Sequence, residues 1–472
     1  MNFCLSLSHF PSCWKIAQVV PLFKKGDPLA CNNYRPISLL PCISKVFEKI
    51  LFDHIFDFLK THSILTHKQS GFIPGDSTIN QLLTICQNIA KHIDNGDEVV
   101  AVFLDLTKAF DRVWHAGLLH KLQQIGIQGS IHRLLSSYLE HRTQYVSLEG
   151  AESSSLRLHA GVPQGSVLGP LLFLVFINDV AEGLQSDAFL FADDTSLFLP
   201  IPHNSSYIEA ATVINRDLAA IDQWAKRWKV SVHPQKTELM VFTNKSSALP
   251  MPQLMLGDQA LRRVSSHTHL GVTLTTGLTW GEHIDKVVKK CGRTLGIMKK
   301  AKYRWSKDAL SRIYTTVVRP TLEYGDIIIV DSCNQQQAAA LEGIQLEAAR
   351  SSRPTTWQLV PRGARRTKHC WQRLHGSLLR RGGRSTSCSK CTSSFIKHHH
   401  LISTPSSPRS NTRLGNSFGF IIPRCTTSKY LNSPLLSTAI LWNSLPNHTK
   451  IEPASNIFKN GKKRITVHKC PV

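Results

Sequence analysis

Long apolar runs are missing from this chain of 472 residues. No stretch approaches the roughly 20 consecutive apolar residues that a membrane-crossing helix needs, and the longest useful run is residues 171–177. The first residues carry no basic segment ahead of an apolar one, so we expect no secretory signal there. Cysteines are few, 12 scattered over the chain, which favours a reduced intracellular protein over a disulfide scaffold.

Acidic residues are also scarce, and one segment has none. The chain has 56 Lys and Arg against 32 Asp and Glu, a net charge of +24. Such a surplus suggests a polyanionic partner, most often nucleic acid. However, residues 1–350 carry a net charge of only +4, and residues 351–410 hold 12 basic and no acidic side chains. Total charge therefore reflects mainly the last quarter of the chain, which also fits a solvated basic linker.

The first 350 residues alternate short apolar runs with helical patterns. Strands interleaved with helices, together with hairpin-like pairs, predict a mixed α/β or α+β fold. The predicted strands are residues 99–106, 145–148, 189–192, 196–199 and 239–242, and the clearest predicted helices are residues 44–60 and 210–228.

Acidic side chains stand at the ends of two predicted strands. Residues 99–104 are apolar on both alternating faces, which is typical of a strand covered on both sides, and Asp105 follows at once. Two apolar runs flank Asp193 and Asp194, so we expect a β-hairpin with this pair at or beside its turn. Adjacent carboxylates repel each other unless a cation neutralises them, and oxygen ligands suit Mg²⁺ or Mn²⁺. The pattern alone leaves open an ordinary turn and a helix cap.

Six sequence blocks surround these acids in a fixed order. They are residues 33–40 (NYRPISLL), 69–75 (QSGFIPG), 103–111 (FLDLTKAFD), 161–170 (GVPQGSVLGP) and 191–194 (FADD), then Trp228 with Lys236-Thr237. In this order and spacing they resemble the reverse transcriptase of non-LTR retrotransposons, of the LINE type and close to the jockey-like elements. The resemblance implies an α+β right-hand polymerase fold with fingers, palm and thumb, followed here by a degenerate basic C-terminal extension.

The resemblance also implies roles for the three acids. Asp105, Asp193 and Asp194 match the palm carboxylates that are catalytic and that hold two metal ions, Mg²⁺ or alternatively Mn²⁺. One ion would lower the pKa of a primer 3′-hydroxyl, and the other would neutralise charge on the pyrophosphate leaving group.

Further residues match the family's nucleotide and nucleic-acid contacts. Phe110 matches a steric gate against the ribose 2′-hydroxyl, with core packing as its alternative role. Gln164 matches a residue of the loop that lies against the templating base pair. Arg35 matches a contact to the incoming triphosphate, and Lys236 matches a residue near the leaving group. The alternative for both basic residues is an ordinary surface charge. A predicted helix has apolar residues on one face and basic residues on the rest. It is either a thumb helix that grips a template–primer backbone or a solvated surface helix. Its basic residues include Lys286, Lys289, Lys290 and Arg293.

The resemblance predicts the domain organisation as well. Fingers and palm would occupy residues 1–275, and a thumb-like helical region residues 276–350. Residues 351–410 would be a disordered or out-of-frame basic segment, because resemblance is lost there and regained beyond it. Residues 411–472 would form a C-terminal tail that resembles the family's terminal region. The pair Cys388-x-x-Cys391 allows a zinc interpretation, although the nearby histidines are poorly spaced.

The sequence thus predicts an RNA-directed DNA polymerase that acts on an RNA template, a DNA primer and deoxynucleoside triphosphates. We expect it in the nucleus and cytoplasm as a ribonucleoprotein, without a membrane, and without the endonuclease that usually precedes this polymerase. One alternative is a truncated, inactive remnant that at most binds RNA. Another is an RNA-dependent RNA polymerase, which shares the two-metal palm, but Phe110 and Ala192 count against it.

Overall fold

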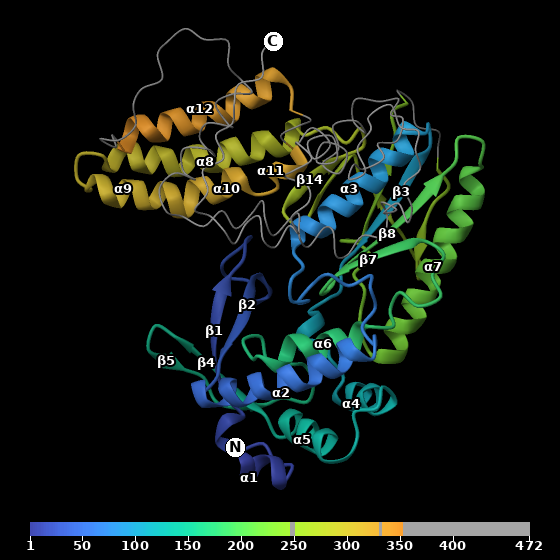
Figure 1. The fold of residues 1–472 in the computed structure, drawn as a ribbon, viewed down its shortest axis with the longest axis vertical. Coiled ribbons are helices and arrows are strands. Elements are labelled where there is room, and N and C mark those ends of the chain that lie inside the picture. Colours follow the sequence, from blue (N-terminus) through green and yellow to red (C-terminus); the bar gives the residue numbers. More distant parts are fainter. Residues whose placement is uncertain (246–250, 330–332, 353–472) are drawn as a thin grey trace, which may run out of the picture. The chain divides into compact units, whose positions relative to one another are not determined.

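The computed structural model describes residues 1–245, 251–329 and 333–352 (Figure 1). Within this part, the chain divides into two compact units. Unit 1 comprises Met1–Thr78, Val99–Val241 and the described residues of Lys245–Val264, and unit 2 comprises Ile79–Glu98, Phe242–Asn244 and the described residues from Ser265 onward.

Unit 1 is built on a five-stranded sheet, which we call the central sheet. Its strand order is β12 (Arg262–Arg263), β9 (Glu238–Phe242), β3 (Glu98–Leu104), β8 (Asp194–Ile201) and β7 (Asp187–Phe191). The middle strand, β3, is buried at all seven positions, as its uninterrupted apolar sequence predicts. β7 and β8 form an antiparallel hairpin in which Phe191 pairs with Asp194. β3 and the β7–β8 hairpin therefore belong to the same sheet.

A second sheet, the N-terminal sheet, also belongs to unit 1. Its order is β2 (Tyr34–Leu39), β1 (Ile16–Phe23), β4 (Thr143–Leu148) and β5 (Ala151–Glu152), with β6 (Leu156–Arg157) paired to β4 as well. β1 pairs with β2 in antiparallel fashion, so that Leu22 lies opposite Arg35. β1 and β4 are parallel. Two small strands, β10 (Met255–Leu256) and β11 (Gln259–Ala260), form a separate antiparallel pair.

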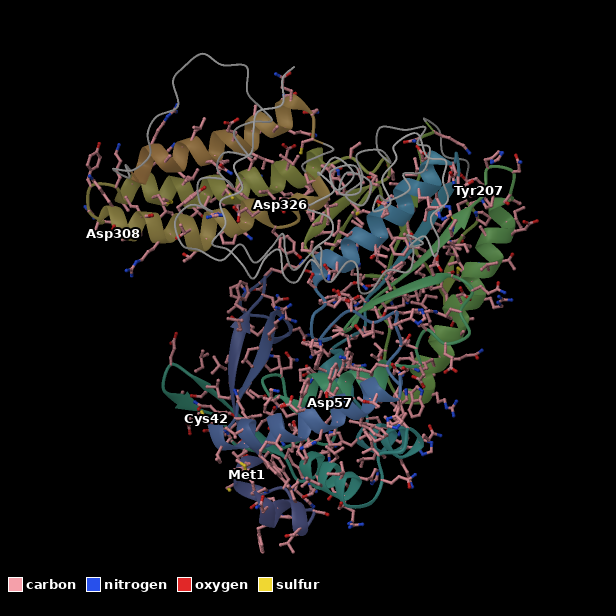
Figure 2. The ribbon with its side chains drawn as sticks, viewed as in Figure 1. Met1, Cys42, Asp57, Tyr207, Asp308 and Asp326 are labelled. Atoms are coloured by element: carbon pink, nitrogen blue, oxygen red, sulfur yellow. The ribbon has the colours of Figure 1, made fainter. Side chains whose placement is uncertain are left out.

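The helices of unit 1 share a single hydrophobic core with the central sheet. They are α1 (Asn2–Ser6), α2 (Cys42–Thr61), α4 (His115–Gln124), α5 (Gly129–Leu139), α6 (Leu168–Ile177) and α7 (Tyr207–Trp228), with 3-10 turns at Ser12–Trp14, Cys31–Asn33 and Ala109–Arg112. Nine of the ten residues of α6 are buried, because this helix is apolar on all sides. α2 runs alongside α6 in Figure 1, and side chains fill the space around them in Figure 2.

Unit 2 is mainly helical. It contains a β-hairpin and a group of helices whose apolar faces pack together, with α8 against α12 and α10. Its elements are α3 (Thr78–Asp94) apart from the first residue, β13 (Ser266–His269), β14 (Val272–Thr275), α8 (Gly281–Ala301), α9 (Lys307–Ile313), a π-turn at Tyr314–Val318, α10 (Arg319–Glu323), α11 (Asp326–Ile329) and α12 (Gln335–Ser352).

The predicted elements are present in the structure. The helices expected over residues 44–60 and 210–228 correspond to α2 and α7, and the expected basic helix is α8. Among the described helices, none combines the length and apolar character needed to cross a bilayer.

The structure describes only part of the chain for which domains were predicted. The two units do not divide at residue 275, because unit 2 takes in residues 79–98 and resumes at Ser265. The assignment of fingers, palm and thumb to residue ranges stays a prediction. The predicted basic segment from residue 353, the tail over 411–472 and the Cys388–Cys391 pair lie outside the described residues.

Candidate active site

The hairpin turn between β7 and β8 carries the adjacent acids. Phe191 pairs with Asp194, so Ala192 and Asp193 alone form the turn, while Asp194 is the first residue of β8. Ala192 has a φ of 57°, in the left-handed region that only glycine adopts at little cost. The predicted hairpin is confirmed, and its turn places Asp193 at the tip with a constrained backbone.

Asp105 follows the buried strand β3 directly. Its backbone oxygen accepts a hydrogen bond from the His233 amide at 2.8 Å, and its carboxylate lies 3.6 Å from the Lys236 ammonium group. The next residues continue this contact, because the Thr107 amide donates to the Ser231 oxygen. The segment before β9 therefore runs beside the end of β3, which explains why Lys236, far away in sequence, lies next to Asp105.

The three acids affect one another electrically. Partial desolvation, together with the negative charges of Asp193 and Asp105, raises the pKa of Asp194 to about 6. The pKa of Asp193 is also raised, first by desolvation and then by Asp105. The positive charges of Arg35 and, for Asp193, Lys24 act in the opposite direction. The structure thus brings Asp105, Asp193, Asp194 and Arg35 close enough to influence one another electrostatically, and the roles predicted for them stay predictions.

The candidate metal ligands are carboxylate oxygens, which suit a hard cation. Carboxylate oxygens that repel one another would be stabilised by a bound divalent ion. In the described part of the chain, however, no three Asp, Glu, His or Cys side chains are already arranged so that they could hold a metal ion. Asp105 is 43% exposed and lies near Lys236 instead. The three acids therefore lie in one site without forming a closed set of ligands.

Phe110 lies on the turn after Asp105 and is held from two sides by aromatic rings. Its ring stacks on Phe173 of α6 with centroids 4.4 Å apart, and Phe72 meets it edge-on at 5.9 Å. Phe110 is half-buried, so part of its ring remains accessible. The position combines core packing with an exposed aromatic surface, so the two roles that the sequence left open do not exclude each other.

Gln164 lies in the loop before α6, which packs against two other elements. Its Nε2 donates to Asp111 at 2.8 Å, and its backbone oxygen accepts from the Ser38 amide of β2 at 2.7 Å. Gly165 allows this approach, because a Cβ there would lie 2.4 Å from the Ser38 oxygen.

The buried carboxylate of Glu48 accepts hydrogen bonds from the amides of Val167 and Leu168 at the start of α6, where a negative charge is favourable.

The predicted nucleic-acid residues of α8 lie in unit 2. The side of α8 with Cys291, Leu295 and Met298 is buried, as the sequence pattern predicts. The basic residues are exposed, and one of them hydrogen-bonds to the β13–β14 hairpin: they are Lys286, Lys289, Lys290 and Arg293. Their exposure agrees with either of the two roles considered for this helix.

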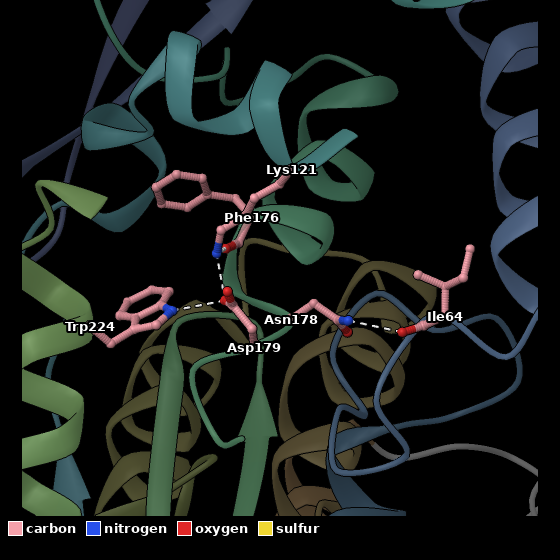
Figure 3. Close-up of polar contacts among 6 residues, drawn as sticks. All are labelled: Ile64, Lys121, Phe176, Asn178, Asp179 and Trp224. Carbon is pink, nitrogen blue, oxygen red and sulfur yellow. Dashed lines mark hydrogen bonds and ion pairs between the residues drawn. The ribbon is translucent and has the colours of Figure 1, made fainter. Parts of the chain in front are cut away.

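A partly buried polar cluster of Lys121, Asp179 and Trp224, which we call the Lys121 cluster, joins α4, α7 and the end of α6 in unit 1 (Figure 3). Lys121 of α4 donates to the Phe176 oxygen at 2.6 Å and to the Asp179 carboxylate at 2.5 Å. Trp224 of α7 donates to the same carboxylate at 2.8 Å. Asn178 holds the loop before Lys68, because it accepts from the Thr66 amide and donates to the Ile64 oxygen.

Sequence reasoning overlooked two residues near the acids. Lys24 follows β1, and its charge lowers the pKa of Asp193. Its signal was the Lys24-Lys25-Gly26 turn between two apolar runs, which is typical of a hairpin tip. Gln69 stood in one of the six blocks, yet no pattern assigned it a role; its side chain contacts the turn at Ala192.

The described part of the chain combines a central sheet with acidic side chains at the end of β3 and at the β7–β8 turn. A family described as reverse transcriptase (RNA-dependent DNA polymerase) matches residues 23–274, more than half of the chain. The chain belongs to this reverse transcriptase family, and its α+β right-hand fold is the one that the sequence predicted.

Curated relatives agree with this assignment. The RNA-directed DNA polymerase from the mobile element jockey of Drosophila melanogaster is 32% identical over 341 residues, which cover 69% of this chain and 36% of the relative. Probable RNA-directed DNA polymerases from transposon BS and the X-element of the same species are 33% and 32% identical, covering 69% and 75% of this chain and 37% and 39% of the relatives. The predicted similarity to jockey-like elements is confirmed, and the chain spans less than two fifths of these relatives.

A solved structure gives a more distant similarity. Apo telomerase from Candida tropicalis is 11% identical with a TM-score of 0.40, over 74% of this chain and 63% of that chain.

Proposed function

We propose that this chain is an RNA-directed DNA polymerase, which adds deoxynucleotides to a primer 3′-hydroxyl on an RNA template. The observation that carries the proposal is the Asp193 turn, which lies in one electrostatic site with Asp105 and Arg35 inside the family domain. The relatives named above are RNA-directed DNA polymerases of mobile elements, and this supports the same reaction here.

In nucleotidyl transfer, the acidic and the basic residues of the site would have different roles. Asp105, Asp193 and Asp194 would hold divalent metal, preferentially Mg²⁺, since reverse transcriptases use such ions and the donors are carboxylates. When bound, this metal supplies Lewis-acid activation of the 3′-hydroxyl and neutralises phosphate charge. Arg35 and Lys24, which lie close enough to influence Asp193, would bind the triphosphate.

Selection of the sugar would rest on Phe110. Because Phe173 and Phe72 hold the ring on two sides, it cannot move away from an added 2′-hydroxyl without disturbing its neighbours. We therefore expect Phe110→Val to incorporate ribonucleotides at least about tenfold more efficiently relative to deoxynucleotides, which corresponds to about 1.4 kcal/mol. Single-nucleotide incorporation of UTP against dTTP measures this ratio, and an unchanged ratio would argue for core packing alone.

The activity itself is tested on the full chain. Purified protein is assayed for dTTP incorporation on poly(rA)/oligo(dT) with Mg²⁺, beside Asp193→Asn/Asp194→Asn. Asp187→Asn is a matched control, because Asp187 is an exposed carboxylate at the other end of the same hairpin. We expect activity in the wild type and in the control but not in the double variant. Incorporation no greater than in the double variant would exclude polymerase activity and favour a protein that only binds RNA.

A further inference from the structure

The Asp193 turn, which consists of Ala192 and Asp193, has a backbone conformation that is unfavourable for residues other than glycine. Ala192 has a φ of 57° and is 95% buried, since only 5% of its surface is exposed. A non-glycine residue in the left-handed region is unfavourable and persists only where its surroundings fix it. Because Asp193 is the next residue, whatever fixes Ala192 also fixes the backbone position from which the Asp193 side chain extends.

Gln69 supplies the contact that fixes this residue. Its Oε1 accepts a hydrogen bond from the Ala192 amide at 2.9 Å and a second from the Gly71 amide at 2.8 Å. The side chain is 6% exposed, so these bonds are shielded from water. Its Nε2 has no hydrogen-bond partner in the described part of the chain, so the acceptor oxygen accounts for all the side-chain hydrogen bonds that Gln69 makes there.

The backbone around Gln69 is built to lie against the turn. Gly71 has no side chain, and a Cβ at this position would lie 2.2 Å from the Ala192 amide nitrogen. Residues 68–70 form a short parallel bridge with β7, because the Ser70 amide donates to the Leu190 oxygen and the Leu190 amide donates to the Lys68 oxygen, both at 2.9 Å. The segment therefore adds to the edge of the central sheet where the catalytic hairpin ends.

The other end of this segment is anchored independently. Asn178, directly after α6, binds the backbone at Ile64 and Thr66 with both atoms of its amide (Figure 3). The Lys68 ammonium group donates to the Ala181 oxygen at 3.1 Å. The loop that presents Gln69 is thus fixed to the same helix end as the Lys121 cluster, and Gln69 acts from a rigid support.

We propose that Gln69 is a positioning residue of the Asp193 turn: its Oε1 holds Ala192 in the left-handed conformation and so fixes the backbone that carries Asp193, a candidate metal ligand. The inference rests on the proposed function for its catalytic readout. It differs from a general packing role, because a packing role would not depend on the residue at position 192.

A double-mutant cycle on the full chain tests this dependence. Gln69→Met keeps the volume but removes the acceptor, Gln69→Glu keeps an acceptor oxygen, and Ala192→Gly removes the backbone strain. Gln87→Met is the matched control, since Oε1 of this glutamine on α3 has no hydrogen-bond partner in the described part of the chain. The readouts are kcat and KM for dTTP on poly(rA)/oligo(dT), and Mn²⁺ affinity measured without nucleotide.

We expect Gln69→Met to lower kcat by about 10- to 100-fold with little change in KM, because misplaced reacting groups slow the chemical step. Its Mn²⁺ affinity should fall as well, while Gln69→Glu should keep more activity than Gln69→Met and Gln87→Met should resemble the wild type. In the Ala192→Gly background, the loss caused by Gln69→Met should shrink to roughly threefold or less.

Equal losses in the two backgrounds would overturn the proposal, because they would mean that Gln69 acts independently of the turn. A Gln69→Met chain with wild-type kcat and Mn²⁺ affinity would overturn it as well. If the wild type makes no product, the proposed function fails, and the same cycle in Mn²⁺ affinity still decides the role of Gln69. A wild type that binds no Mn²⁺ would contradict both.

Discussion

The Lys121 cluster and the Asp193 turn are two charged sites of the same unit with opposite designs. In the first, the Lys121 ammonium group meets the Asp179 carboxylate and a backbone oxygen, with the Trp228 ring 4.0 Å away. In the second, Asp193 and Asp194 are adjacent like charges, and within the described part of the chain neither acid forms an ion pair with a basic side chain. The first site pairs opposite charges, while the second holds like charges next to each other.

The difference shows what each site is for. The pair of Lys121 and the partly buried Asp179, with hydrogen bonds from Trp224 and to the Phe176 oxygen, joins three helices through opposite charges. Adjacent carboxylates with raised pKa values destabilise the metal-free fold instead, and this is the arrangement that a cation would relieve. We infer that the Lys121 cluster is structural and that the turn is a site for chemistry.

The largest expected effect separates activity from stability at the turn. Asp193→Asn should lower dTTP incorporation by roughly a thousandfold, about 4 kcal/mol, because a metal ligand is lost. It should also raise the free energy of unfolding of the metal-free protein slightly, by about 0.5 kcal/mol, since like-charge repulsion between partly exposed groups is removed. Primer extension and urea unfolding in EDTA measure the two. Loss of both activity and stability would show that Asp193 is mainly structural.

At the Lys121 cluster we expect the reverse pattern. Lys121→Met should lower the free energy of unfolding by about 2–3 kcal/mol, because Asp179 loses its ion-pair partner while Asp179 is only 34% exposed. Urea unfolding followed by the fluorescence of Trp224 and Trp228 checks this. Lys121→Met/Asp179→Asn should recover part of the loss, because the unpaired charge is removed and an oxygen remains for Trp224. A single variant as stable as the wild type would contradict the structural role.

The pH dependence of stability sharpens the same contrast. Burial lowers the pKa of Lys121 from 10.5 to about 8, although Asp179 opposes the shift. The unfolded chain therefore binds more protons at this group between pH 8 and 10.5, so unfolding free energy rises with pH across that window. Relative to Lys121→Met, the rise should reach about 3 kcal/mol. The measurement is urea unfolding of both proteins at several pH values, and parallel profiles would refute the shift.

The smallest effect is expected for exposed charge on α8. Lys289→Gln/Lys290→Gln should weaken binding of an RNA/DNA hybrid at low salt and reduce the slope of log affinity against log salt by about one to two, because phosphate contacts are lost. The double control Lys49→Gln/Lys226→Gln removes exposed lysines that already pair with carboxylates four residues away. Filter binding between 50 and 200 mM salt compares them. Equal changes in slope would mean that α8 has no specific role.

Local pattern predicted the strands that carry the acids, while the right-hand fold came from the resemblance to the family. The apolar run before Asp105 requires a strand covered on both faces, and β3 is buried at every position. The runs around Asp193 and Asp194 require a hairpin, which the pairing of Phe191 with Asp194 confirms. Other contacts were not predictable, because Lys236 reaches Asp105, and Gln69 reaches Ala192, across long stretches of sequence.

The sequence by itself determined the family, the strands and helices, and the identity of the three acids, because these depend on residue order and on periodicities of a few residues. Only the tertiary structure decided which distant groups act on those acids. Gln69 could be assigned to the turn only when the segment before it lay along β7, with Gly71 leaving space for the Ala192 amide. Hydrogen bonds and charges act over a few ångströms in space, and no local pattern in the chain encodes that proximity.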